Sequence, residues 1–167
     1  MLSALVVATI AAAPAAIAPA LVPPSSVTLN LRTQGRGVQI YVCEAKPDKP
    51  GTYGWSFKAP RATLYSFDGR IVGHHYAGPS WEGVDGGKVV GDLLAKAPSP
   101  EPSAIDWLLL SAKSANRVGV LGKTAYVQRI RTVGGRAPDQ GCSAANAGAE
   151  AQTPYSAEYD FYSVPTD

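Results

Sequence analysis

Residues 155–162 read YSAEYDFY and carry the clearest structural signal in the sequence. Tyr155, Ala157, Tyr159 and Phe161 stand at every second position, and polar side chains separate them. Successive side chains of a β-strand point to opposite faces of the sheet, so a period of two is typical of a strand with one buried face. The sequence therefore predicts such a strand close to the carboxyl end of the chain.

Similar runs recur at short intervals before this stretch. Residues 38–43 (VQIYVC) alternate and are rich in β-branched and aromatic side chains, which favours another strand. Turn signals divide the chain at residues 48–51, 68–69 and 85–87. Between and after these turns we expect strands at residues 53–58, 62–67, 71–77, 88–94 and 126–133.

Residues 107–110 (WLLL) form a continuous apolar run rather than an alternating one. A segment that is apolar at every position is expected to be buried on both faces. It is therefore either a central strand or a short helix in the core.

The composition fits one globular domain. The chain has 167 residues, of which 46% are apolar and 17% charged, so it can build a core and is not a disordered chain. Its 17 glycines and 14 prolines favour many short strands joined by turns. We predict an all-β fold, a single-domain sandwich or squat barrel of about eight to ten short strands. The β domain is expected at residues 35–163, between tails at 21–34 and 164–167.

The first 22 residues contain no charged side chain and combine an apolar run with small residues. This pattern is typical of a secretory signal peptide, and we predict that residues 1–20 are removed by cleavage after Ala20. The alternative is an uncleaved membrane anchor, which Pro14 and Pro19 disfavour. The sequence thus predicts a protein that is secreted, periplasmic or held in the cell envelope, without stable membrane insertion after cleavage.

The chain has two cysteines, Cys43 and Cys142. An even number of cysteines in an exported protein favours a disulfide bond. The bond would close a loop of about 100 residues, worth on the order of 4–5 kcal/mol in the chain-entropy description. Two buried free thiols are the alternative, and the wide spacing does not fit a metal-binding or redox motif.

Several motifs resemble a known family. They are Gly37-x-Gln39-x-Tyr41-x-Cys43, His75-x-Ala77-Gly78-Pro79-x-Trp81-Glu82, Trp107-Leu108-Leu109-Leu110, Gln128-Arg129-x-x-Thr132-x-Gly134-Gly135-x-Ala137-Pro138, Gly141-Cys142 and the alternating run at 155–162. Together they are similar to the exported bacterial and fungal family described as domain of unknown function 3455, over roughly residues 35–162. The resemblance implies no established function. Some fungal relatives carry the label malate dehydrogenase, but the nearest glycine motif, Gly35-Arg36-Gly37, lacks the third glycine and the following helix of a dinucleotide site.

Both histidines lie in residues 74–85 (HHYAGPSWEGVD), beside an indole and two carboxylates. We predict a ligand-binding site built from His75, Trp81, Glu82 and Asp85, which would take a small molecule or a saccharide. Trp81 is expected on a loop, where its ring could stack on a flat ligand or cover the end of the barrel.

Two arginines add to the candidate site. Arg129 and Arg131 are separated by one residue in an expected strand, so they should share one face, which Lys123 could extend. Such a face could bind a carboxylate or an acidic polymer through Arg129, or could simply be solvated.

Other functional classes remain open at this stage. His75 and Glu82 could hold copper or zinc in a metal-dependent oxidoreductase, although His74 and His75 on one strand cannot both reach the same ion. A hydrolase with two carboxylates could use Glu82 with Asp85, Asp92 or Asp106. A structural envelope protein with no site is a further alternative. No cofactor other than such a metal is expected. The net charge of +2 and the lack of a Lys/Arg-rich run argue against nucleic acid as a partner.

Overall fold

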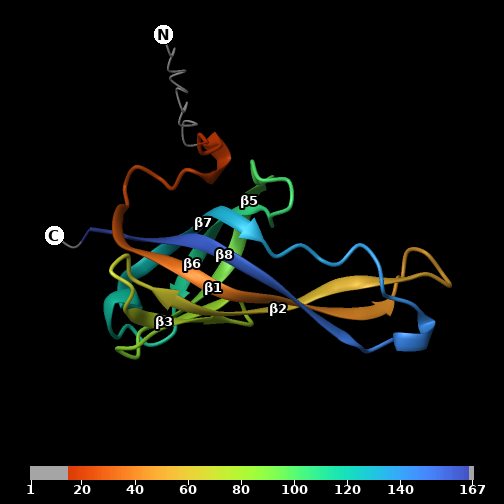
Figure 1. The fold of residues 1–167 in the computed structure, drawn as a ribbon. Coiled ribbons are helices and arrows are strands. Elements are labelled where there is room, and N and C mark those ends of the chain that lie inside the picture. The colour runs from red at the N-terminus through yellow and green to blue at the C-terminus, as the bar shows by residue number, and fades with distance from the viewer. Residues whose placement is uncertain (1–14, 166–167) are drawn as a thin grey trace, which may run out of the picture.

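The protein folds as a closed antiparallel barrel of eight strands (Figure 1). The computed structural model describes residues 15–165. The strands are β1 (Thr28–Ala45), β2 (Tyr53–Tyr65), β3 (Ile71–Tyr76), β4 (Ser80–Gly83), β5 (Lys88–Ala97), β6 (Trp107–Ser114), β7 (Thr124–Gly134) and β8 (Glu150–Ser163). Each strand pairs with the next along the chain, and β8 pairs with β1 to close the ring. Short 3-10 helices are η1 (Pro19–Leu21), η2 (Val120–Lys123) and η3 (Ala144–Asn146). The predicted all-β fold is confirmed, in its barrel form.

The core fills the inside of this barrel. The inward side chains of β8 are Tyr155, Ala157, Tyr159 and Phe161, as the alternation predicted. The outer face of β8 is buried as well, since Asp160 accepts a hydrogen bond from Arg32 of β1 at 2.6 Å and Glu158 pairs with Arg131 of β7. Ion pairs thus cover the polar positions that a solvated strand would expose to water.

Strand β1 begins at Thr28, so residues 28–34 belong to the barrel and not to the expected tail. Its inward positions at Thr33, Gly35 and Gly37 carry small side chains or none, because the large residues of β8 need the space. A Cβ atom on Gly35 would lie 2.5 Å from a ring carbon of Tyr159. These small residues hide the alternating apolar pattern by which strands are recognised in a sequence.

Strand β2 is also longer than expected, because the two predicted strands at 53–58 and 62–67 form one. The chain passes Pro60 without leaving the sheet. Pro60 pairs with Gln39 next to a register shift at Ile40 and Tyr41 of β1. A bulge of this kind tolerates a residue that has no N–H to donate.

The apolar run at 107–110 forms the first half of β6 and is covered on both faces, as predicted. Leu110 packs inside the barrel. Trp107 and Leu109 point outward and pack against Leu21 of η1, which is 0% exposed. Gln128 of β7 donates a hydrogen bond to the carbonyl oxygen of Leu21 at 2.6 Å. The segment before β1 therefore covers the outside of β5, β6 and β7.

The predicted signal peptide lies mostly outside the described residues, since only residues 15–20 of it belong to them. Within residues 15–165, the helices are all too short to cross a membrane.

The two ends of the barrel differ. At one end, which we call the closed end, Leu121 of η2 packs into the core. At the other, the open end, β1, β2 and β8 run on beyond the remaining strands as an extended arm (Figure 1). The disulfide between Cys43 and Cys142 lies in this arm, with the two Cα atoms 5.4 Å apart, which confirms the predicted bond.

Candidate functional site

His75 and Trp81 meet inside the barrel, near its open end. They face each other across the β3–β4 pair, and their rings stack with centroids 4.5 Å apart and planes at 8°. Trp81 is 1% exposed and belongs to β4, so the expectation that it lies on a loop is wrong. Gly91 of β5 makes room for the indole, because a Cβ atom there would lie 2.9 Å from Trp81 Cζ3.

His75 is held in its neutral form. Its Nδ1 donates to the carbonyl oxygen of Ser80 at 2.8 Å, which leaves Nε2 without a proton. Burial lowers the pKa of His75 to about 3, an effect that this hydrogen bond partly opposes and the charge of Arg129 reinforces. The imidazole is therefore uncharged at neutral pH.

Tyrosines complete the aromatic group around His75. The ring of Tyr159 lies 5.1 Å from that of His75 and 5.8 Å from that of Trp81, centroid to centroid. Its hydroxyl oxygen is 3.0 Å from that of Tyr155. Burial raises the pKa of both tyrosines, so both hydroxyls stay protonated.

A cavity of about 350 Å³ opens beside this group, at the open end of the barrel. Most of its wall is apolar. The lining residues are Phe57, Lys58, Pro60, His75, Ala77, Gly78, Pro79, Trp81, Leu93, Leu108, Leu110, Arg129 and Tyr159. Two apolar members of the wall reach solvent, since Phe57 and Leu93 are each 57% exposed.

Arg129 points into the barrel and lines the cavity. Its Nε and Nη2 donate to the carbonyl oxygen of Asp106, at 3.1 and 2.8 Å. Arg131 lies on the outer face with Glu158, so the prediction that the two arginines share a face is wrong. The cause is a register shift in β7 between Ile130 and Val133, where Arg131 adopts a φ of 50°.

Glu82 and Asp85 are not part of the cavity wall. Glu82 follows Trp81 on β4 and therefore points outward, where Tyr76 donates a hydrogen bond to its Oε2 at 2.5 Å. Asp85 lies in the β4–β5 turn at the closed end and accepts hydrogen bonds from the backbone N–H of Gly87 and of Val120. These bonds lower the pKa of Asp85 and fasten η2 to the turn. The structure thus separates both carboxylates from His75.

The separation bears on the two enzymatic alternatives. His74 faces Glu82 across the β3–β4 pair, and His75 faces Trp81 on the other side of the sheet. In the described part of the chain, no three His, Cys, Asp or Glu side chains gather in a way that could hold a metal ion. Of the carboxylates proposed for a hydrolase, Glu82 and Asp85 lie on different parts of the barrel, Glu82 on an outer face and Asp85 in a turn.

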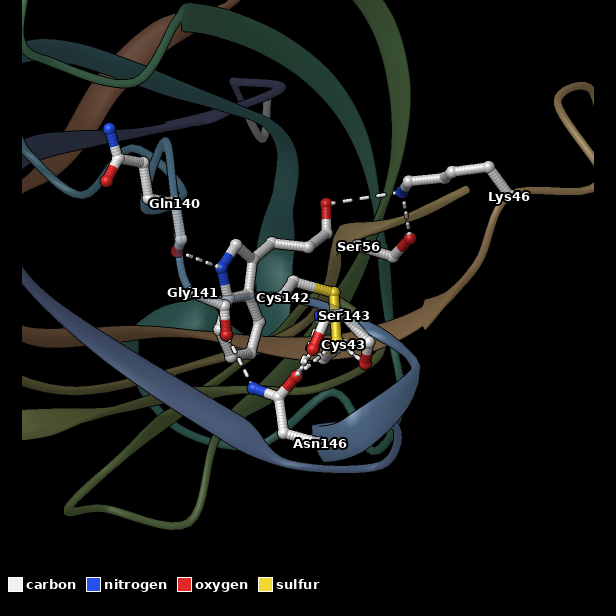
Figure 2. The surroundings of a disulfide bond; sticks show 9 residues. Cys43, Lys46, Ser56, Gln140, Gly141, Cys142, Ser143 and Asn146 are labelled. Atoms are coloured by element: carbon white, nitrogen blue, oxygen red, sulfur yellow. Dashed lines mark hydrogen bonds between the residues drawn. A yellow bond between two sulfur atoms is a disulfide. The ribbon is translucent and has the colours of Figure 1, made fainter. Parts of the chain in front are cut away.

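The cysteines fasten the arm. Figure 2 shows the bond between Cys43 and Cys142, with Asn146 beside it and with Lys46 turned toward Ser56. Lys46 Nζ donates to Ser56 Oγ at 2.7 Å, and Asn146 Oδ1 accepts from the backbone N–H of Ser143 at 2.7 Å. Both sulfurs are bonded to each other, so neither serves as a nucleophile.

Sequence reasoning missed much of the cavity wall. Tyr159 could have been found, because the alternation at 155–162 already turned it inward. Phe57 and Leu93 gave no signal, since an apolar residue in a strand says nothing of a cavity. Their exposure becomes visible only once the barrel closes.

No curated protein and no solved structure matches the chain. The model of one protein family, described as "Protein of unknown function (DUF3455)", matches residues 23–163. This match covers all of the barrel strands, from β1 to β8. The chain therefore belongs to the DUF3455 family.

Proposed function

We propose that this protein binds one small, largely apolar molecule in the cavity at the open end of its barrel. The observation that carries the proposal is the cavity of about 350 Å³, which has a mainly apolar wall and lies beside the stacked rings of His75 and Trp81. Ligand cavities of proteins have volumes of roughly 300–1,000 Å³, with mostly apolar walls and a few polar groups. A barrel of about eight strands has an interior wide enough for one small ligand.

The polar groups at the cavity favour binding over catalysis. A histidine whose pKa is about 3 is a weak base, so His75 suits a hydrogen-bond acceptor better than a proton carrier at neutral pH. Tyr159 remains protonated and suits a donor. A saccharide would present many hydroxyl groups to a wall that is mainly apolar, which makes it the weaker of the two predicted ligand classes.

The proposal includes export from the cytoplasm. Disulfide bonds persist in oxidising compartments and are rare in reducing ones. The Cys43–Cys142 bond therefore supports the export suggested by the apolar segment at residues 1–20.

The test uses a neutral apolar fluorophore, N-phenyl-1-naphthylamine, whose emission rises when it leaves water. We expect saturable binding with one site per chain. Leu93→Gln should weaken it about tenfold, because an amide then replaces an apolar contact in the wall. Leu94→Gln is the matched control, since Leu94 is 55% exposed, next in the chain, and not among the lining residues.

Both variants should keep the unfolding midpoint of the parent, because both side chains are more than half exposed. Two outcomes would overturn the proposal: no saturable binding of the fluorophore, or equal affinities of Leu93→Gln and the parent.

A further inference from the structure

A second groove, whose wall is more polar than that of the cavity, continues the cavity at the open end of the barrel. Phe57, Leu108 and Arg129 line both, so the two spaces share a wall. The remaining residues of the groove are Gln39, Tyr41, Lys96, Ile105, Asp106, Arg136, Ala137 and Asp139. The outer end of a molecule bound in the cavity would therefore lie close to the charged side chains of the groove.

Two guanidinium groups in this groove are held by one short segment of backbone. Arg129 donates to the carbonyl oxygen of Asp106, and Arg136 Nε donates to that of Ala104 at 2.9 Å. The segment is itself fixed, because the backbone N–H of Ile105 donates to Gly134. Both arginines are thus oriented by backbone carbonyls, which carry no net charge.

Neither arginine has a carboxylate partner. Among residues 15–165, no carboxylate oxygen of an Asp or Glu side chain lies within 4.0 Å of either guanidinium. The partly buried Arg129 thus lacks a counter-ion, which is costly where a side chain loses contact with water. Arg32 and Arg131 on the outer face differ, since both pair with carboxylates of β8.

A third donor lies in the same groove. Gln39 is 2% exposed, and its Nε2 has no hydrogen-bond partner within the described chain. Buried amide groups are nearly always paired, so an unpaired donor beside two arginines points to an acceptor that the ligand supplies.

We propose that the ligand carries a carboxylate, which binds Arg129, Arg136 and Gln39 in the groove while its apolar part fills the cavity. This inference rests on the proposed function and names the class of ligand. Guanidinium groups pair well with a carboxylate through two parallel hydrogen bonds. Asp106, Asp139 and Lys96 also line the groove, and the two carboxylates make it favour a single negative charge over a doubly charged phosphate.

The test compares decanoate with 1-decanol, which share the same chain length and differ at the head. Each displaces the bound fluorophore in a competition titration at pH 8. Decanoate should bind at least tenfold more tightly, because it makes charge-assisted hydrogen bonds that the alcohol cannot. Its advantage should shrink as salt is added.

The variant Arg136→Gln should remove most of the advantage of decanoate and leave the affinity for 1-decanol within about twofold. Arg129→Gln should also remove most of that advantage, but Arg129 lines the cavity itself, so the affinity of this variant for 1-decanol does not serve as a control. Arg61→Gln is the matched control. Arg61 is exposed and bonds to Gln152 on the outside of the barrel, so this change removes the same charge away from the groove. The advantage should persist in that control.

The outcomes separate the two proposals. Equal affinity for acid and alcohol, or an advantage that survives Arg136→Gln and Arg129→Gln as it does Arg61→Gln, would overturn the carboxylate site and leave the apolar cavity as the binding site. Failure of the neutral fluorophore to bind would instead overturn the proposed function itself.

Discussion

His75 is an ionisable side chain that the barrel keeps uncharged. It is 3% exposed, it stacks on Trp81, and its Nδ1 is bonded to a backbone carbonyl. Protonation would place a second positive charge near Arg129, on an imidazole that is buried inside the barrel. The residue that the sequence singled out for chemistry is thus better suited to hold the shape and polarity of the cavity.

This burial makes stability depend on pH in a definite direction. The unfolded chain takes up a proton at His75 below a pKa of 6.5, and the folded protein does so only near 3. The free energy of unfolding therefore falls as the pH drops from about 6.5 to about 3. Between pH 6.5 and pH 4, His75 alone should account for a loss of about 3 kcal/mol.

The loss is measured by urea unfolding at the two pH values. His75→Phe should lose about 3 kcal/mol less than the parent over this interval, because no proton is taken up at this position. His74→Phe is the control, since His74 is exposed on the outer face. Equal losses in the parent and His75→Phe would contradict a neutral buried imidazole.

At the scale of the strands, local patterns in the sequence predicted well wherever one strand face meets the core. The alternation at 155–162 gave the inward face of β8, and the apolar run at 107–110 gave a strand covered on both sides. The start of β1 was missed, because Gly35 makes way for Tyr159 across the strands. The outward orientation of Arg131 was missed for a related reason. The bulge in β7 that turns this side chain outward depends on how β7 pairs with β8.

The candidate site could be predicted only in part. His75, Trp81 and Arg129 do line one cavity, but they come from strands whose pairing the sequence does not state. Glu82 and Asp85 are close to them in sequence and lie elsewhere, because a strand alternates its faces and a turn lies at its end. Nearness along the chain was therefore a poor guide to nearness in space.

The segment before β1 should contribute to stability although it lies outside the barrel. Leu21 is 0% exposed between Trp107, Leu109 and Ile130. Leu21→Ala should lower the free energy of unfolding by about 2–4 kcal/mol. The neighbouring Val22 is 56% exposed, so Val22→Ala should change it by less than about 0.5 kcal/mol.

Chemical denaturation of these two variants and of the parent measures the two changes in the free energy of unfolding. Similar midpoints for Leu21→Ala and Val22→Ala would mean that the segment does not pack on β6 and β7.

At the scale of the whole molecule, one covalent bond joins the arm to the loop between β7 and β8. Cys43 and Cys142 are 99 positions apart, so the bond restricts most of the unfolded chain. The double variant Cys43→Ser/Cys142→Ser should lose about 4–5 kcal/mol of stability in the chain-entropy description.

Guanidinium unfolding of the double variant measures this loss, and the parent treated with a reducing agent should show the same one. If the double variant were as stable as the parent, the bond would not stabilise the fold by restricting the unfolded chain. Intact mass analysis of protein from its own host gives a separate check, because two free thiols there would contradict the proposed export.

The opposed ends of the barrel have a practical consequence for attachment. Val164 and Pro165 follow β8 next to η2, and Figure 1 shows this end of β8 on the side away from the arm. A linker or biotin joined after Pro165 would therefore attach the closed end of the barrel to a sensor chip and leave the entrance of the cavity facing the flowing sample. A label introduced at Phe57 would instead obstruct the entrance of the cavity.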